Sequence, residues 1–120
     1  MNKLQKREMI KNYKNVAIAS LDKVLDSLYS MKNQYSPELV RAAGFNVTEK
    51  EEKILSDYNK SIPIYEAIKR TVQNDEELTT YEINLIGISM LFAGTLMKSQ
   101  GENMIKSSTK IVEMANKLMT

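Results

Sequence analysis

The chain has 120 residues, the usual size of one domain, and its 17 basic and 15 acidic side chains leave a formal net charge of +2. With 42% hydrophobic and 27% charged residues, the composition is that of a globular protein. The sequence contains no Cys, His or Trp. Disulfides, thiolate zinc sites and nucleophilic catalysis that depends on Cys or His are therefore excluded. We expect a single domain over residues 1–120.

The N-terminal sequence MNKLQKREMIKNYKN is charged and lacks the apolar stretch of a secretory signal. Nowhere does the chain contain an uncharged apolar run of about 18 residues, the length that indicates a membrane span. We therefore expect a cytoplasmic protein with no membrane span. The richness in Lys, Asn, Ile and Ser indicates a bacterial or phage source.

Apolar residues with helical spacing predict a long first helix over about residues 4–33. The positions that lie three, four or seven residues apart are Ile10, Ala17, Leu21, Val24, Leu28, Met31 and Tyr35. Because these positions share one side of a helix, they identify the face that we expect in the core.

Start and stop signals divide the middle of the chain into shorter helices. A Ser-Pro-Glu sequence followed by a glycine predicts a short helix over residues 37–43. Thr48 and Glu51 have the spacing of a capping box and predict the start of a third helix. Pro63 is expected to break or kink that helix, which leaves a further helix over residues 64–73.

Thr79 and Glu82 repeat the capping-box spacing at the start of the last helix. We expect this helix to continue over residues 80–119, with a break at Gly101 as the alternative. Its part over residues 83–97 is apolar on nearly every side and is expected to be buried in the core. The chain as a whole is expected to be all-α: a bundle of four to six helices in which long first and last helices pack antiparallel.

The last helix carries a regular alternation of small and large residues, which we call the small-residue seam. Small residues recur every seven positions at Gly87, Gly94, Gly101, Ser108 and Ala115, and large ones recur between them at Met90, Met97, Met104 and Ile111. A line of small residues lets two helix backbones approach closely, with large side chains packed beside the contact. The seam therefore predicts a site of helix pairing.

The length of the last helix bears on the partner of this seam. A continuous helix over residues 80–119 would be about 60 Å long, whereas the first helix would cover only about 45 Å. Part of the seam would then have no partner within the chain, and four apolar side chains would be exposed: Ile111, Met114, Leu118 and Met119. A symmetric homodimer is the expected remedy, with a different protein on the same strip as the alternative.

The first helix also carries a basic face, formed by Lys3, Lys6, Arg7, Lys11 and Lys14. Such a face can bind phosphates or an acidic partner, but an ordinary solvated helix surface is the favoured interpretation. The net charge is +4 over residues 1–35, −4 over residues 36–82 and +2 over residues 83–120. The acidic middle can therefore neutralise the basic ends within one bundle.

Motifs for catalysis and cofactor binding are missing from the sequence. It has no glycine loop for phosphates, no calcium-loop spacing and no Glu-x-x-His sequence. We therefore expect no enzymatic activity, no cofactor and no metal. The expected function is that of a protein-interaction module, such as an adaptor, an inhibitor or an immunity-type or phage accessory protein, that docks a helical face on a partner protein. The alternative is a nucleic-acid-associated protein that binds backbone phosphates through the basic face.

Overall fold

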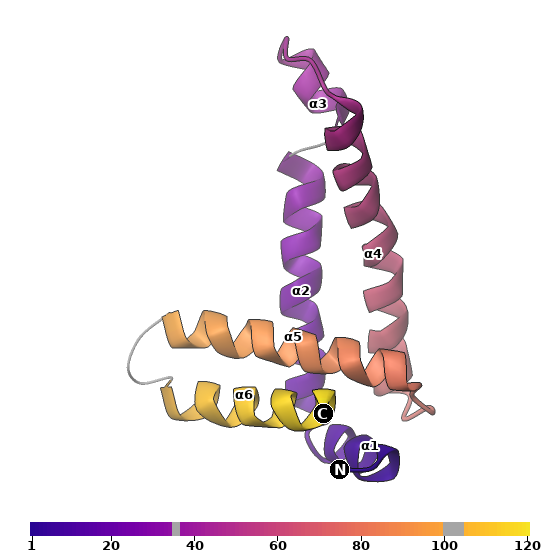
Figure 1. The fold of residues 1–120 in the computed structure, drawn as a ribbon, viewed down its shortest axis with the longest axis vertical. Helices are drawn as coiled ribbons and strands as arrows, with labels where there is room; N and C mark the ends of the chain where they lie inside the picture. The colour runs from indigo at the N-terminus through magenta and orange to yellow at the C-terminus, as the bar shows by residue number, and fades with distance from the viewer. Residues whose placement is uncertain (35–36, 100–104) are drawn as a thin grey trace.

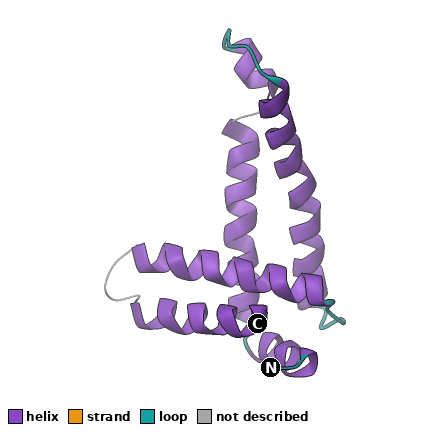
Figure 2. Ribbon diagram, in the orientation of Figure 1, coloured by secondary structure: helices purple, strands orange, loops and turns teal. Residues whose placement is uncertain are grey.

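The computed structural model describes residues 1–34, 37–99 and 105–120, which form six α-helices and no strand (Figure 1). The helices are α1 (Lys3–Asn12), α2 (Lys14–Gln34), α3 (Pro37–Ala42), α4 (Glu49–Gln73), α5 (Thr80–Ser99) and α6 (Ile105–Met119). Only short loops and turns join them in the described part of the chain (Figure 2). The expected all-α class with four to six helices is confirmed.

Two antiparallel helix pairs make up the fold. α2 and α4 lie side by side, and the pair of α5 and α6 crosses them near the N-terminal part of α2 (Figure 1). α3 lies at the far end of the α2–α4 pair, which makes the molecule elongated. Its dimensions are 51 × 36 × 23 Å. The antiparallel partners are thus α2 with α4 and α5 with α6, and not the first helix with the last.

The hydrophobic core lies where the two pairs cross. Each of the four helices contributes at least one side chain that is almost completely buried: Leu21 from α2, Ile68 from α4, Ile86 from α5 and Leu118 from α6. The apolar stripe predicted for the first helix supplies Ile10, Ala17 and Leu21 to this core. Burial of such side chains is the main favourable contribution to folding.

The long first helix expected over residues 4–33 is divided at Tyr13, where φ is −115° and ψ is 37°. α1 begins with a capping box between Asn2 and Gln5 and ends when the Tyr13 N–H donates to the carbonyl of Met9. The bend turns α1 so that Ile10 joins the same buried cluster as Leu78 of the α4–α5 connection. A single straight helix was therefore the wrong expectation. Of its predicted core positions, Ile10, Ala17 and Leu21 are buried and Val24, Leu28 and Met31 are half-buried, while Tyr35 lies outside the described residues.

Pro63 does not break α4, which is helical from Glu49 to Gln73. Proline removes the N–H that would bond to the carbonyl of Asn59. Both residues are exposed, so water can hydrogen-bond that carbonyl. The expected separate helix over residues 64–73 is therefore the second half of α4.

The last helix expected over residues 80–119 is instead two helices, α5 and α6, and α6 runs back along α5 (Figure 1). The continuous helix is therefore wrong, and the alternative of two helices is correct. Gly101 itself lies outside the described residues. At the start of α5 the predicted capping box is present, because the Thr79 N–H donates to Glu82 Oε1 at 2.9 Å and the Glu82 N–H donates to Thr79 Oγ1 at 3.2 Å.

Replacement of Leu21 by Ala should lower the free energy of unfolding by about 2–5 kcal/mol, because it opens a cavity where α2 meets α4 and α5. The matched control is Leu4→Ala in α1, where the side chain is 64% exposed and the change should stay within about 0.5 kcal/mol. Urea unfolding followed by circular dichroism measures both. Equal losses for the two variants would contradict the position assigned to the core.

Candidate interaction surfaces

Two glycines of the small-residue seam lie at the contact between α5 and α6. A β-carbon added at Gly87 would lie 2.7 Å from Met119 Cγ and 3.2 Å from the carbonyl oxygen of Ala115. One added at Gly94 would lie 2.8 Å from Val112 Cγ2 and 3.3 Å from the carbonyl oxygen of Ser108. These separations are shorter than ordinary van der Waals contact. The two helix backbones therefore approach as closely as they do because both positions lack a side chain.

The register of this contact explains the period of seven. Gly87 faces Ala115 and Gly94 faces Ser108, so each small residue of α5 meets a small residue of α6. Both pairs are centred on Gly101, which lies outside the described residues together with Met104. Small residues spaced evenly along the sequence meet one another because α6 packs antiparallel against α5.

The burial of the other described members of the seam agrees with this packing. Met90, Ser108 and Ala115 are buried, whereas Met97 and Ile111 are half-buried. The side chains that were expected to be exposed are covered as well, since Met114 and Leu118 are buried and Ile111 and Met119 pack against the core. The pairing of the seam is internal. A homodimer through the seam was expected from a single helix of about 60 Å, and residues 80–119 form two shorter helices instead.

Replacement of Gly94 by Leu should destabilise the protein by about 1–3 kcal/mol, because the new side chain must push α6 away at Val112 and at the backbone of Ser108. Gly94→Ala should show a smaller loss, since the helix propensity of alanine offsets part of the overpacking. The control is Ser27→Leu, at an exposed helical position in α2. Thermal unfolding compares the three variants, and a Gly94→Leu variant as stable as the parent would refute the close packing.

The basic face of the N-terminal segment is partly neutralised by the acidic turn between α4 and α5. Arg7 Nη1 lies 3.4 Å from Glu77 Oε1, and Lys14 Nζ lies 3.2 Å from Asp75 Oδ2. Lys14 also donates to the backbone carbonyl of Gln73 at 2.8 Å. These contacts attach α1 and the start of α2 to the α4–α5 turn. The charge balance inferred from the sequence is therefore realised between these two regions.

The other three residues of the basic face stay nearer to solvent, since Lys3 and Lys11 are exposed and Lys6 is half-exposed. Lys11 and Arg7 line a small depression of about 130 Å³ between α1 and the α4–α5 turn. Its floor is apolar, formed by Ile10, Val72 and Leu78. Carboxylates of the turn line the same depression. The basic side chains are thus mixed with acidic ones here and do not form a continuous positive surface.

A wider, open cleft of about 410 Å³ lies between α2 and α4. Two polar contacts cross it between the helices: Lys69 Nζ lies 2.6 Å from Asp22 Oδ1, and the Tyr29 hydroxyl donates to Glu66.

The hydrogen bond to Glu66 raises the pKa of Tyr29, while burial raises the pKa of Tyr65. Because the folded-state pKa values lie above the unfolded value of 10.0, the free energy of unfolding should decrease as the pH rises past about 10.

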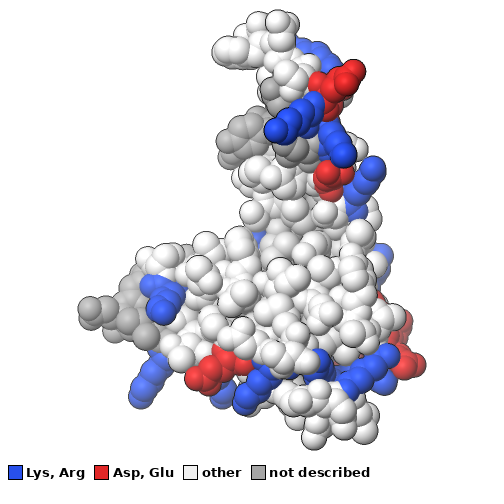
Figure 3. All heavy atoms as spheres, viewed as in Figure 1, with Lys and Arg blue, Asp and Glu red and all other residues white. Residues whose placement is uncertain are grey.

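The outward side of α5 is apolar and exposed. We call it the α5 strip, and its four residues are Tyr81 (62% exposed), Ile88 (46%), Phe92 (36%) and Leu96 (37%). Their spacing of seven, four and four residues places them on one side of the helix. The expectation that residues 83–97 would be buried is therefore wrong for this side of α5. Figure 3 shows the corresponding uncharged area over α5.

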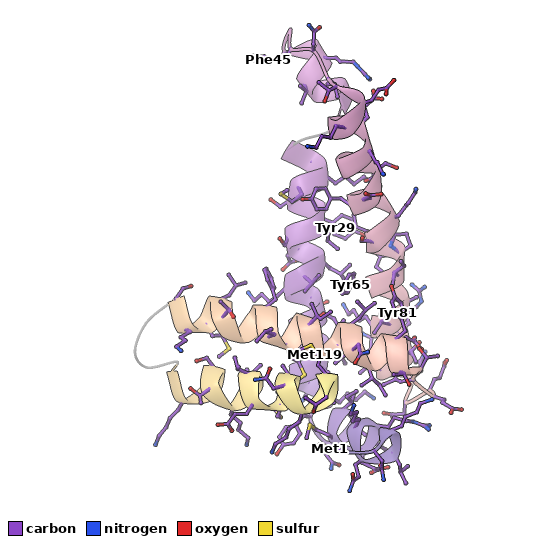
Figure 4. The ribbon with its side chains drawn as sticks, in the orientation of Figure 1. Met1, Tyr29, Phe45, Tyr65, Tyr81 and Met119 are labelled. Carbon is purple, nitrogen blue, oxygen red and sulfur yellow. The ribbon has the colours of Figure 1, made fainter. Side chains whose placement is uncertain are left out.

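One side of α6 extends this area. Val112 and Met119 touch the seam glycines of α5, and Thr109 and Asn116 are exposed on the same side of α6. We call the α5 strip and these four residues of α6 the outer face. The charged residues of α6 share the side that points away from α5: Lys106, Lys110, Glu113 and Lys117. Tyr81 lies at the N-terminal end of α5 and Met119 at the C-terminal end of α6 (Figure 4).

The outer face is not evident in the amino-acid sequence for a physical reason. α5 has apolar residues on nearly every side, so no polar stripe distinguishes the solvent side from the core side. Among the described residues, α5 is also the one helix that is long and apolar enough to cross a membrane by length and composition. Seven of its residues are buried within the protein, as in the core helix of a bundle. The sequence feature that could have indicated an exposed apolar surface is the absence of charge between Glu82 and Lys98.

The described residues bring together no group of three or more Asp or Glu side chains that could hold a metal ion. Comparison of the chain with known protein families, with curated proteins and with solved structures finds no match. The chemistry of the surfaces is thus the basis on which function can be inferred.

Proposed function

We propose that this chain is a non-enzymatic, cytoplasmic protein-interaction module that docks its outer face on a partner protein. The observation that carries the proposal is the α5 strip, an exposed apolar surface on a helix without a charge between Glu82 and Lys98. Contiguous exposed apolar patches are typical of interaction sites. An adaptor, inhibitor or immunity-type factor, of bacterial or phage origin, uses such a surface without needing catalytic groups.

The composition of the outer face supports this proposal. Tyr81 and Phe92 are the residue types that are enriched where interfaces bind most strongly. The charged stripe of α6 lies at the edge, which is the arrangement of an apolar centre with a polar rim. The helices beneath the face are held by the close packing of α5 on α6, so little conformational entropy is lost on binding.

The nucleic-acid alternative is less well supported. Arg7 and Lys14 are two of the five residues of the basic face, and both are paired with carboxylates of the α4–α5 turn. Phosphate binding would have to compete with these contacts. Three lysines then remain, which is a small charge for backbone binding at physiological salt.

Site-specific photo-crosslinking from Thr95 should capture the partner protein. Thr95 is exposed on α5 between Ile88 and Leu96, and the natural chain has no cysteine, so Thr95→Cys provides one attachment point for a maleimide photo-crosslinker. The matched control is Ser56→Cys, an exposed position on α4. In a lysate of the native host, we expect a discrete protein adduct from Thr95 and none from Ser56.

The adduct should be lost when Ile88→Glu is added to the Thr95→Cys chain, because a buried carboxylate without a partner is costly in an interface. Mass spectrometry of the adduct identifies the captured protein. Equal labelling from Thr95 and Ser56, or an adduct that persists with Ile88→Glu, would contradict docking through the outer face.

Binding to arbitrary duplex DNA should be undetectable at low salt, because two of the five basic residues are already neutralised. Fluorescence anisotropy with labelled duplex measures it over a range of salt concentrations. A measurable affinity that falls steeply with salt, and falls further with Arg7→Ala and Lys11→Ala, would instead support the nucleic-acid function.

A further inference from the structure

We infer that the partner on the outer face is a second copy of this chain, so that two α5–α6 pairs pack face to face in a symmetric homodimer. The inference rests on the proposed function, because it names the occupant of the same surface. It differs from pairing through the small-residue seam, whose glycines are already covered by α6.

The exposed area of the chain exceeds that of a compact monomer. A folded monomer of 13.7 kDa exposes about 6,600 Å². This chain exposes 7850 Å², and its radius of gyration is 16.5 Å where a compact domain of this length has about 13.6 Å. The excess of about 1,250 Å² is larger than the roughly 800 Å² that each partner contributes to a standard interface. Part of the excess comes from α3 and the ends of α2 and α4, which extend beyond the α5–α6 pair (Figure 1), and the exposed α5 strip adds to it.

The outer face has suitable dimensions. α5 is 20 residues long, which corresponds to about 30 Å. With α6 beside it, the face is two helices wide, or about 20 Å, and covers about 600 Å² in projection. Since a rough surface has a larger accessible area than its projection, the face can bury an area close to that of a standard interface. Two such faces in contact form a two-layer arrangement of four helices around a shared apolar centre.

The distribution of charge is compatible with a second copy of the chain as the occupant. In a symmetric dimer, a residue near the two-fold axis meets the same residue of the partner, so a charge there would face a like charge. The centre of the outer face, around Ile88 and Phe92, has no charged residue on α5 or on the adjoining side of α6. A two-fold axis through this region therefore brings no like charges together.

A lipid surface fits the outer face less well. Helices that lie on membranes surround their apolar side with Lys and Arg, which bind anionic headgroups. In α6, Lys106, Lys110 and Lys117 instead share a stripe with Glu113 on the side that points away from α5. The polar residues that border the strip on α6, Thr109 and Asn116, are uncharged.

Light scattering and sedimentation equilibrium test the dimer on the purified full chain. The parent should have twice the chain mass at micromolar concentrations and a melting temperature that rises with protein concentration. Ile88→Glu should raise the dimer dissociation constant at least about 30-fold, because it places two carboxylates in one apolar centre. The matched control is Phe45→Glu, since Phe45 is 68% exposed in the α3–α4 loop, outside the outer face. It should change the constant less than about threefold.

If Ile88→Glu reduces the helical circular dichroism signal, Phe92→Ser provides the same test without adding a charge. A parent that stays monomeric up to about 100 μM would overturn self-pairing. A monomeric parent that still gives a foreign adduct from Thr95→Cys leaves the docking function standing and refutes only the second copy. Flotation of the parent with anionic vesicles, abolished by Ile88→Glu, would overturn self-pairing in favour of a lipid surface.

Discussion

The contact between the backbones of α5 and α6 determines the rest of this structure. Gly87 and Gly94 allow α6 to lie directly against α5, and this placement brings Ala115 and Leu118 into the core. α5 can then cross α2 with one side while α6 covers a second side. Because two sides of α5 are used in this way, its third side is left to solvent. The exposed α5 strip is thus a direct result of the close packing beneath it.

Local signals in the sequence were sufficient for most helix boundaries and for the fold class. The capping boxes, the Ser-Pro-Glu start and the apolar stripe of the N-terminal segment act over three to seven residues, so they can be interpreted without the tertiary structure. The failures have tertiary causes. Tyr13 interrupts a helical pattern because Ile10 reaches the core only when α1 turns, and Pro63 is tolerated because the affected carbonyl faces water.

The seam shows why a correct pattern led to a wrong arrangement. A repeat of small residues predicts close helix packing, and Gly87 and Gly94 do lie in such a contact. Periodicity does not state whether the partner helix belongs to another chain or follows in the same one. The exposed side of α5 could not be predicted for a related reason, since a helix that is apolar all round gives no direction to solvent. Its neighbours in space decide which residues stay exposed.

The position of Leu118 has a consequence for how the protein folds as it is synthesised. This side chain is fully buried in the cluster that also holds Ala17 and Leu21 of α2. α2 and α4 can associate as soon as both have left the ribosome, but the part of the core that α6 covers stays open until residue 118 has emerged. The nascent chain therefore passes through a stage in which its apolar α2 side chains are in contact with water and accessible to chaperones. The core closes only with the arrival of the last helix.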